Sequence, residues 1–362
     1  HILKNLGAEV SEDGGCVKIS CSNVKNSVPD KSLVSSMRAS VVLLGALLVR
    51  TGKVELSFPG GDLIGSRPID IHLKAFKQMG ARVEEGEIVK ISAGKLSGAE
   101  LFAESSVTGT ENMVLAAVLA KNQTIVKLAA QEPHVVCLCE FLNRMGAKIS
   151  GIGTNTLVIE GVERLHGAKM EVIPDMIETG TFIVLAAATK SEVTVEAVDH
   201  NQMDAVYHKL SEMGVRFEKL PEALKILPPA HEYTSTVIRT GLYPNLATDI
   251  QPLFGLLATQ CRGITRLHDW IWEGRLGYLA ELKKMGANAR IIDTHQAEVT
   301  GPTQLSGEII HSMDIRSGIT LLVAALVAKG KSEILDIHHI DRGYEKIEQR
   351  LQKLGADIKR VE

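Results

Sequence analysis

The sequence predicts an α/β fold built from a six-fold repeat, and three observations lead to this prediction. An amphipathic helix that ends in a hydrophobic residue, a glycine and a small residue recurs six times. An Ala/Leu/Val-rich helix, a short polar turn and a strand precede every copy but the first, and one or two β-branched stretches follow each glycine. Strands that alternate with helices in this way indicate the α/β class.

The recurring glycine marks the end of each amphipathic helix. The six glycines are Gly7, Gly80, Gly146, Gly214, Gly286 and Gly355. Each follows the last apolar helical position, where a left-handed residue ends the helix and glycine adopts that conformation most easily. The Ala-rich helices are apolar on most faces, so we expect them in the interior with sheets packed around them.

Six copies of similar length divide most naturally as three plus three. We place the crossing between the halves near residues 159–175, which predicts domains at 1–173 and 174–362. The first copy has no apolar helix ahead of it, and the chain opens with His1. The first repeat is therefore expected to be incomplete, in a chain truncated at its amino terminus.

Charge and composition exclude several classes of protein. The 362 residues include 40 basic and 43 acidic side chains, for a net charge of −3, so no overall excess of positive charge would hold nucleic acid or an anionic membrane. The apolar runs are too short to cross a bilayer. Five cysteines without metal-site spacing, and a start without a signal sequence, favour a reducing cytoplasm. The twelve histidines show no metal-binding spacing.

Arginines stand where a phosphate or carboxylate would be held. Arg38, Arg316 and Arg342 lie at expected helix starts, and Arg67 follows a glycine-rich turn over residues 57–72. Helix amino termini favour anions, and a guanidinium binds an oxyanion through two parallel hydrogen bonds. Taken singly, each arginine is more often a surface charge and the turn a solvent-exposed loop. Together they suggest an anionic substrate.

Acidic residues also stand at helix starts, namely Asp175, Glu178, Asp249 and Asp314. For each acid taken alone, simple capping of the helix amides is favoured over a catalytic or binding role, and periodicity does not separate the two interpretations.

Six segments, taken in order, resemble the motifs of one enzyme family. They read PGGDLIGSRPIDIH, SVTGTEN, IPDMIETGTF, ATDIQ, IWEGR and HHIDRGYEKIE. The family is UDP-N-acetylglucosamine enolpyruvyl transferase, also called UDP-N-acetylglucosamine 1-carboxyvinyltransferase. The resemblance runs through the whole chain. It implies an inside-out α/β barrel fold, with two domains of three βαβαββ units whose helices lie inside.

The resemblance also implies an activity. The enzyme would transfer the enolpyruvyl group of phosphoenolpyruvate to the 3′-hydroxyl of UDP-N-acetylglucosamine and release phosphate, the first committed step of peptidoglycan synthesis and hence of cell-wall biogenesis, cell shape and division. Both substrates are small anionic molecules, no metal or organic cofactor is implied, and no protein partner is indicated. Arginines at helix starts would hold the reactants and stabilise developing charge.

Individual roles follow from the matching positions. Asp249 falls where the family places the acid beside the sugar hydroxyl, as the base that removes its proton. Asp62 falls where most members carry the cysteine that donates a proton and is alkylated by fosfomycin. A carboxyl group can donate that proton if its pKa is raised, so we expect Asp62 to act as the acid in a fosfomycin-resistant enzyme. Its loop is expected to close over the substrates.

Further positions match the family's substrate contacts. The phosphoenolpyruvate and diphosphate clamps would be Arg38, Arg67 and Arg342, assisted by Arg316. The contacts to the nucleotide sugar would be Pro68, Asp70, Ile71, Ser105, Val107, Thr108, Gly109 and Ile271.

The chain departs from the family pattern at several positions. A Lys-Asn pair near the family's amino terminus has no counterpart, Ser105 replaces a common lysine, and Met176 replaces an arginine. Leu246 and Ala247 stand in place of Phe-Pro. Two alternatives therefore remain open: an enzyme like enolpyruvylshikimate phosphate synthase, which shares the donor, and a non-catalytic paralogue that binds the sugar nucleotide. A purely structural repeat protein is disfavoured by the charged helix starts.

Overall fold

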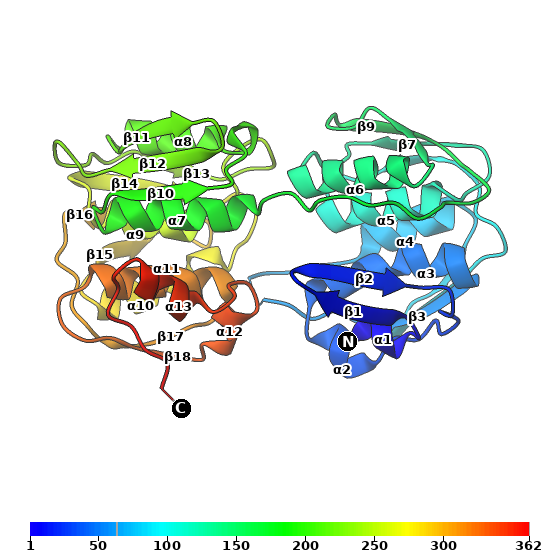
Figure 1. Cartoon of the computed structure of the whole chain (residues 1–362), viewed down its shortest axis with the longest axis horizontal. Helices are drawn as coiled ribbons and strands as arrows, with labels where there is room; N and C mark the ends of the chain where they lie inside the picture. The colour runs from blue at the N-terminus through cyan, green and yellow to red at the C-terminus, as the bar shows by residue number, and fades with distance from the viewer. Residues whose placement is uncertain (63, 362) are drawn as a thin grey trace. The chain divides into compact units, whose positions relative to one another are not determined.

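The computed structural model describes residues 1–62 and 64–361, and Figure 1 shows their helices and strands. Contacts within the chain define two compact units. The first comprises His1–Asp62 and Arg67–Ile173, and the second comprises the short stretch up to Ser66 and the residues from Pro174 onward. Within the described ranges, no helix combines the length and the apolar character that crossing a membrane requires.

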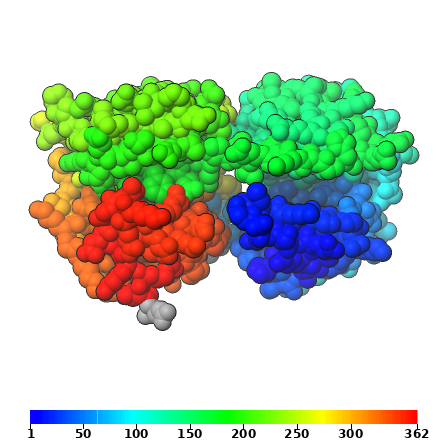
Figure 2. All heavy atoms as spheres, in the orientation of Figure 1, coloured from blue at the N-terminus to red at the C-terminus, as the bar shows by residue number. Residues whose placement is uncertain are grey.

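The first unit contains three sheets among its described residues. Their strand orders are β1-β2, β3-β5-β4 and β6-β7-β9-β8, and the β1–β2 hairpin lies at the surface of this unit (Figure 2). The elements are α1 (Ile2–Asn5), β1 (Glu9–Asp13), β2 (Cys16–Ser20), α2 (Lys31–Ser35), η1 (Arg38–Val42), α3 (Leu43–Thr51), β3 (Lys53–Ser57), α4 (Asp70–Gln78), β4 (Arg82–Glu84), β5 (Ile88–Ser92), β6 (Glu100–Phe102), α5 (Val107–Ala117), β7 (Gln123–Lys127), α6 (Pro133–Arg144), β8 (Lys148–Ser150) and β9 (Thr156–Glu160).

The second unit also contains three sheets in its described part, with the orders β10-β12-β11, β13-β14-β16-β15 and β17-β18. Its elements are α7 (Met176–Ala188), β10 (Val193–Glu196), η2 (His200–Gln202), α8 (Asp204–Glu212), β11 (Arg216–Leu220), β12 (Ala223–Leu227), β13 (Val237–Arg239), α9 (Gln251–Ala258), β14 (Gly263–His268), η3 (Arg275–Gly277), α10 (Tyr278–Lys284), β15 (Asn288–Ile291), β16 (Gln296–Gly301), β17 (Ile309–His311), α11 (Ile315–Val327), β18 (Glu333–Leu335), α12 (His338–Asp341) and α13 (Ile347–Lys353).

All six predicted helix ends are confirmed. The glycines at 7, 80, 146, 214, 286 and 355 have φ between +77° and +97°. At each of them the glycine N–H bonds to the carbonyl three residues back, and the next N–H bonds to the carbonyl five residues back, as in Ala81 N to Phe76 O. This is the Schellman arrangement, which satisfies carbonyls that the helix leaves unpaired.

The prediction of interior Ala-rich helices is also confirmed. Every residue of α7 from Thr179 to Ala188 is buried, as is every residue of α9. Helices α7, α9 and α11 pack on one another in the second unit, as α3 and α5 do in the first. Because these helices present no polar face, they are stable only with sheets and partner helices around them.

Parallel crossovers bring the starts of the interior helices to the ends of strands. Helix α5 connects the parallel strands β6 and β7, α9 connects β13 and β14, and α11 connects β17 and β18. The loop that leads into each helix therefore begins at the carboxyl end of a strand. Loops in that position are where α/β folds collect functional side chains.

Candidate active site

In the first unit, two predicted arginines lie close together. Arg38 is the first residue of η1, and its Nη2 donates to the carbonyl of Pro68 at 3.1 Å. Burial, and to a lesser extent the charge of Arg67, lower the pKa of Arg38 to about 10. Gly61, with φ of +121°, lies between them, because a Cβ there would be 3.0 Å from Arg38 Cβ and 3.1 Å from Arg67 Nη1. A bound anion would relieve this like-charge repulsion.

A buried polar network holds this region in place. Asn112 of α5 accepts from Gly45 N at 2.6 Å and donates to Val41 O at 2.9 Å and to His72 Nδ1 at 2.8 Å. Burial lowers the pKa of His72 to about 4, with Arg38 acting in the same direction and Asp70 opposing it. A neutral imidazole that accepts at Nδ1 carries its proton on Nε2, which faces Thr108 Oγ1 at 3.4 Å. The network thus joins η1, α4 and α5.

The two stretches predicted to contact the nucleotide are neighbours. Asp70 is the first residue of α4 and is exposed, and Ile71 follows it. Ile71 approaches the start of α5 so closely that a Cβ on Gly109 would lie 3.4 Å from Ile71 Cγ2. Ser106 caps α5 by accepting from Gly109 N at 3.2 Å.

The loop before α5 is strained at Ser105. Its φ is +57° and that of Glu104 is +50°, in a left-handed region that residues with side chains seldom occupy. Ser105 N donates to Leu128 O at 2.7 Å, which helps to hold this conformation. Such strain is common where a loop is shaped for a ligand.

Asp62 lies in the glycine-rich loop and is half-buried. Residue 63 of the same loop lies outside the described residues. The segment up to Ser66 is grouped with the second unit, and Arg67 returns the chain to the first.

In the second unit, Asp249 forms the centre of a charged cluster. Its Oδ1 accepts from Arg275 Nη2 at 2.7 Å, and its Oδ2 accepts from Arg316 Nε at 2.9 Å. Arg275 also donates through Nε to Thr248 Oγ1 at 3.1 Å. Thr248 in turn donates to Asp269 Oδ2 at 2.7 Å. The carboxylate just ahead of α9 is therefore held in one orientation by two cations.

Arg275 is a residue that the sequence analysis missed. Its side chain is only 2% exposed, and its Nη1 lies 3.9 Å from Asp314 Oδ1. A signal for it was present, because Arg275 ends the IWEGR segment and begins a helical turn, as Arg38 does.

Arg316 connects this cluster to the start of α11. Asp314 caps that helix by accepting from Arg316 N at 2.8 Å and Ser317 N at 3.1 Å. Burial lowers the pKa of the Arg316 guanidinium, but the Asp249 carboxylate outweighs it and the net direction is upward. Arg316 Nη1 lies 3.4 Å from the Tyr344 hydroxyl. Arg342 is exposed and lies two residues before Tyr344, directly after α12.

Of the other acids at helix starts, Asp175 acts as a cap and Glu178 forms an ion pair. Asp175 accepts from Ile177 N and Glu178 N at the start of α7, and Glu178 pairs with Arg350.

Ile271 is half-buried in a turn fixed by Asp269 Oδ1, which accepts from Ile271 N at 3.0 Å. Among residues 1–62 and 64–361, no group of acidic, histidine and cysteine side chains is arranged to hold a metal ion.

The predicted residues therefore form two groups, one in each unit. Arg38, Arg67, Pro68 and the stretches around Ile71 and Gly109 gather at the starts of η1, α4 and α5. Asp249 and Arg316 gather with Arg275 at the starts of α9 and α11. A single cleft formed by both groups stays a prediction.

Solved structures define the class of fold. The enolpyruvyl transferase NikO from Streptomyces tendae superimposes with a TM-score of 0.89 at 24% identity, over 99% of this chain and 86% of that one. EPSP synthase from Acinetobacter baumannii gives a TM-score of 0.70 at 19% identity, over 97% and 85%. The predicted enolpyruvyl transferase fold is confirmed.

Sequence comparison identifies the family within the enolpyruvyl transferases. The profile of the EPSP synthase (3-phosphoshikimate 1-carboxyvinyltransferase) family matches residues 1–351. A protein of Koribacter versatilis named UDP-N-acetylglucosamine 1-carboxyvinyltransferase is 41% identical over 367 residues, covering 100% of this chain and 84% of that one. One of the same name from Finegoldia magna is 40% identical, covering 100% and 86%. The chain belongs to the UDP-N-acetylglucosamine 1-carboxyvinyltransferase family.

Proposed function

We propose that this protein transfers the enolpyruvyl group of phosphoenolpyruvate to the 3′-hydroxyl of UDP-N-acetylglucosamine. The hydroxyl oxygen adds to C2 of the donor while C3 gains a proton. Loss of that proton and of phosphate then restores the double bond. The full-length similarity, at about 40% identity, to proteins named for this reaction carries the proposal. The product would enter peptidoglycan synthesis.

Asp249 would remove the proton from the sugar hydroxyl. Its Oδ1 and Oδ2 accept hydrogen bonds from Arg275 Nη2 at 2.7 Å and from Arg316 Nε at 2.9 Å. The two guanidiniums fix the orientation of the carboxylate. Orientation of this kind is a large part of what a general base contributes.

Asp62 would supply the proton that C3 gains. Its loop carries glycines at positions 60, 61 and 65, and Gly61 and Gly65 both have positive φ, so the backbone adopts shapes that other residues resist. A carboxyl group at this position forms no stable adduct with fosfomycin, which alkylates thiols. Resistance to the drug follows from the proposal.

Arginines would bind the anionic parts of both substrates. Arg38 and Arg67 form a concentrated positive site in the first unit, and Arg342 with Arg316 would contribute from the second. Two nearby guanidiniums suit a phosphate or carboxylate because each can donate two parallel hydrogen bonds.

The nucleotide would lie along the first unit's group. Pro68, Asp70 and Ile71 would contact the uracil, and the α5 start from Ser105 to Gly109 would hold the diphosphate, because free amides at a helix start favour anions. Ile271 would contact the nucleotide sugar. We also infer a cytoplasmic location, which suits the five free cysteines.

A direct test measures phosphate release and identifies the product by mass spectrometry. With phosphoenolpyruvate and UDP-N-acetylglucosamine, we expect turnover that falls by about 10²–10⁴-fold in Asp249→Asn, the range for loss of a general base. The matched control is Asp175→Asn, which removes a capping carboxylate from another interior helix. Full activity of Asp249→Asn, or equal losses in both variants, would contradict the assigned base.

A second candidate is transfer to a shikimate phosphate. The match of residues 1–351 to the EPSP synthase profile favours it, as does Ser105 in place of a lysine that would face the nucleotide. Thermal stabilisation by each acceptor separates the two, because only the true acceptor binds the folded state. We expect a rise in Tm with UDP-N-acetylglucosamine and none with shikimate 3-phosphate.

A further inference from the structure

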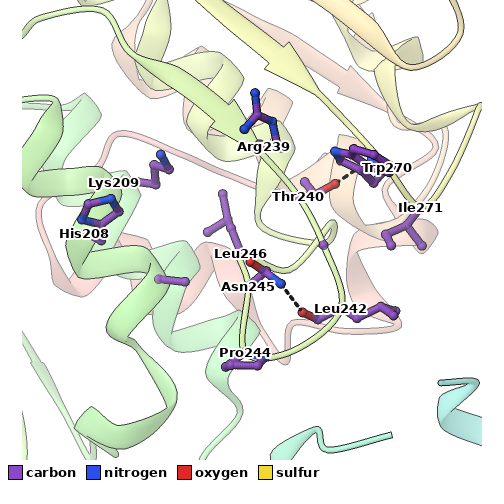
Figure 3. Close-up of a pocket in the computed structure, with 12 residues that line it drawn as sticks. His208, Lys209, Arg239, Thr240, Leu242, Pro244, Asn245, Leu246, Trp270 and Ile271 are labelled. Carbon is purple, nitrogen blue, oxygen red and sulfur yellow. Dashed lines mark hydrogen bonds between the residues drawn. The ribbon is translucent and has the colours of Figure 1, made fainter. Parts of the chain in front are cut away.

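The second unit contains a groove outside the residues assigned to the reaction. It has a volume of about 790 Å³ and is bordered by α8 on one side and by the end of β13 and the loop that follows it on the other (Figure 3). This volume is within the range of small-molecule sites, about 300–1,000 Å³. Ile271 is the one lining residue shared with the proposed substrate contacts.

The walls of the groove are cationic and apolar. Lys209 of α8 and Arg239 of β13 line it, together with Leu242 and Leu246, and its described lining includes no carboxylate side chain. Lys209 is paired with Glu212 at 2.8 Å, and its side chain is 17% exposed. In the described part of the chain Arg239 has no side-chain hydrogen bond or ion pair, and it is exposed.

The unpaired state of Arg239 stands out on its own sheet. Arg266 and Arg290 on neighbouring strands both bond to Glu298, at 3.4 and 2.7 Å. Arg239 instead lies opposite His268 in the parallel register of β13 and β14. A guanidinium without a counter-ion beside an apolar hollow is equipped to bind an anion.

A planar aromatic surface adjoins Arg239. Trp270 is 62% exposed, and its ring stacks on His268 with centroids 5.1 Å apart and an interplanar angle of 26°. The backbone of Trp270 is anchored, because its N–H donates to Thr240 Oγ1 at 3.0 Å. Figure 3 shows Arg239 between Lys209 and Trp270. A held, exposed indole is a stacking surface for a planar ring.

We propose that this groove binds a nucleoside phosphate, with Arg239 on the phosphate and the Trp270 indole against the base. The site goes beyond the proposed function, because Arg239, Lys209 and Trp270 have no part in it. A ligand here would contact the loop from Thr240 to Leu246, which continues directly into Asp249.

The test uses tryptophan fluorescence. The chain has two tryptophans, so Trp272→Phe leaves Trp270 as the only indole. We expect UMP to quench its emission saturably. Uridine and inorganic phosphate should each bind at least about tenfold more weakly, because each lacks one of the two contacts. Equal binding of phosphate and UMP would overturn the role of Trp270, and absence of saturable quenching by UMP would overturn the site.

Matched variants locate the anion contact. In the same background, Arg239→Ala should weaken UMP binding at least about tenfold, on the scale of a charge-assisted hydrogen-bond pair. Arg266→Ala removes a paired arginine of the next strand and should leave binding unchanged. Equal effects of the two substitutions would reject the site. If UMP still quenches the Trp270 emission saturably but the protein shows no transferase activity, the groove is supported and only the proposed function is contradicted.

Discussion

Arg38 in the first unit and Arg316 in the second occupy similar positions but differ in electrostatics. Both lie at the start of a segment that leads into an interior helix. Burial lowers the pKa of both guanidiniums, and Arg67 lowers that of Arg38 further, to about 10. Around Arg316 the Asp249 carboxylate reverses the direction. The comparison shows that similar positions have different roles. In the second unit the charge of Arg316 is neutralised by a carboxylate of the same unit, whereas in the first unit Arg38 lies near a second cation, Arg67.

The largest effect on stability is expected from Arg275. Arg275→Met removes the more buried of the two guanidiniums that bind Asp249. We expect the free energy of unfolding to fall by about 3 kcal/mol, the lower end for breaking a buried ion pair, because Arg316 still pairs with the carboxylate. The control is Arg262→Met, whose ion pair to Glu232 is exposed and contributes about 0–1 kcal/mol. Urea unfolding measures both. Equal losses would show that Asp249 does not depend on Arg275.

The first unit should respond to an anion. Phosphoenolpyruvate at about a hundred times its Kd should raise the free energy of unfolding by about 2.7 kcal/mol. Arg67→Gln should lose most of that increase, because it removes one of the two guanidiniums that would hold the anion. Arg266→Gln, at an exposed ion pair, serves as the control. A ligand effect preserved in Arg67→Gln would disprove the anion site.

Two titratable groups of the first unit should give opposite pH dependences. Burial and Glu132 raise the pKa of Glu111 from 4.5 to about 7, so its contribution to the free energy of unfolding falls as pH rises between these values. The pKa of His72 is lowered from 6.5 to about 4, so its contribution rises with pH over that interval.

Single substitutions should separate the two slopes. In Glu111→Gln, the free energy of unfolding should increase more steeply with pH between pH 4.5 and 7 than in the parent. In His72→Gln, it should increase less steeply than in the parent between pH 4 and 6.5. We expect differences of up to about 3 kcal/mol, from shifts of two to three pKa units at about 1.4 kcal/mol per unit. Unfolding curves in a pH series measure them, and parallel curves for all three proteins would refute the two assignments.

The smallest effect concerns the repeated caps, where the two units should behave alike. Gly80→Ala and Gly214→Ala place a side chain at φ of +91° and +77° with open space around the Cβ. Each should lower the free energy of unfolding by about 1–2 kcal/mol through backbone strain alone. Gly94→Ala, also in open space but without a positive φ, is the control. Thermal unfolding of the three variants gives the comparison.

Much of the fold was predictable because its signals are local. A glycine after the last apolar helical position specifies a left-handed cap wherever it occurs, and all six glycines have that conformation. The uniformly apolar character of α7 and α9 likewise requires an interior position. The candidate site was predictable in part, because helix-start arginines and acids can be recognised one at a time. Arg275 was missed because its importance depends on partners from other segments.

The sequence by itself determined the period, the helix ends, the interior helices and membership in the family, since each depends on the order of neighbouring residues. Only the tertiary structure decided which charges meet. Asp249 pairs with Arg275, 26 residues away, and with Arg316, 67 residues away, and Asn112 reaches His72 across 40 residues. Such pairings form only when helices from different repeats pack together, because the cost of burying a charge is offset by its spatial neighbours and not by its sequence neighbours.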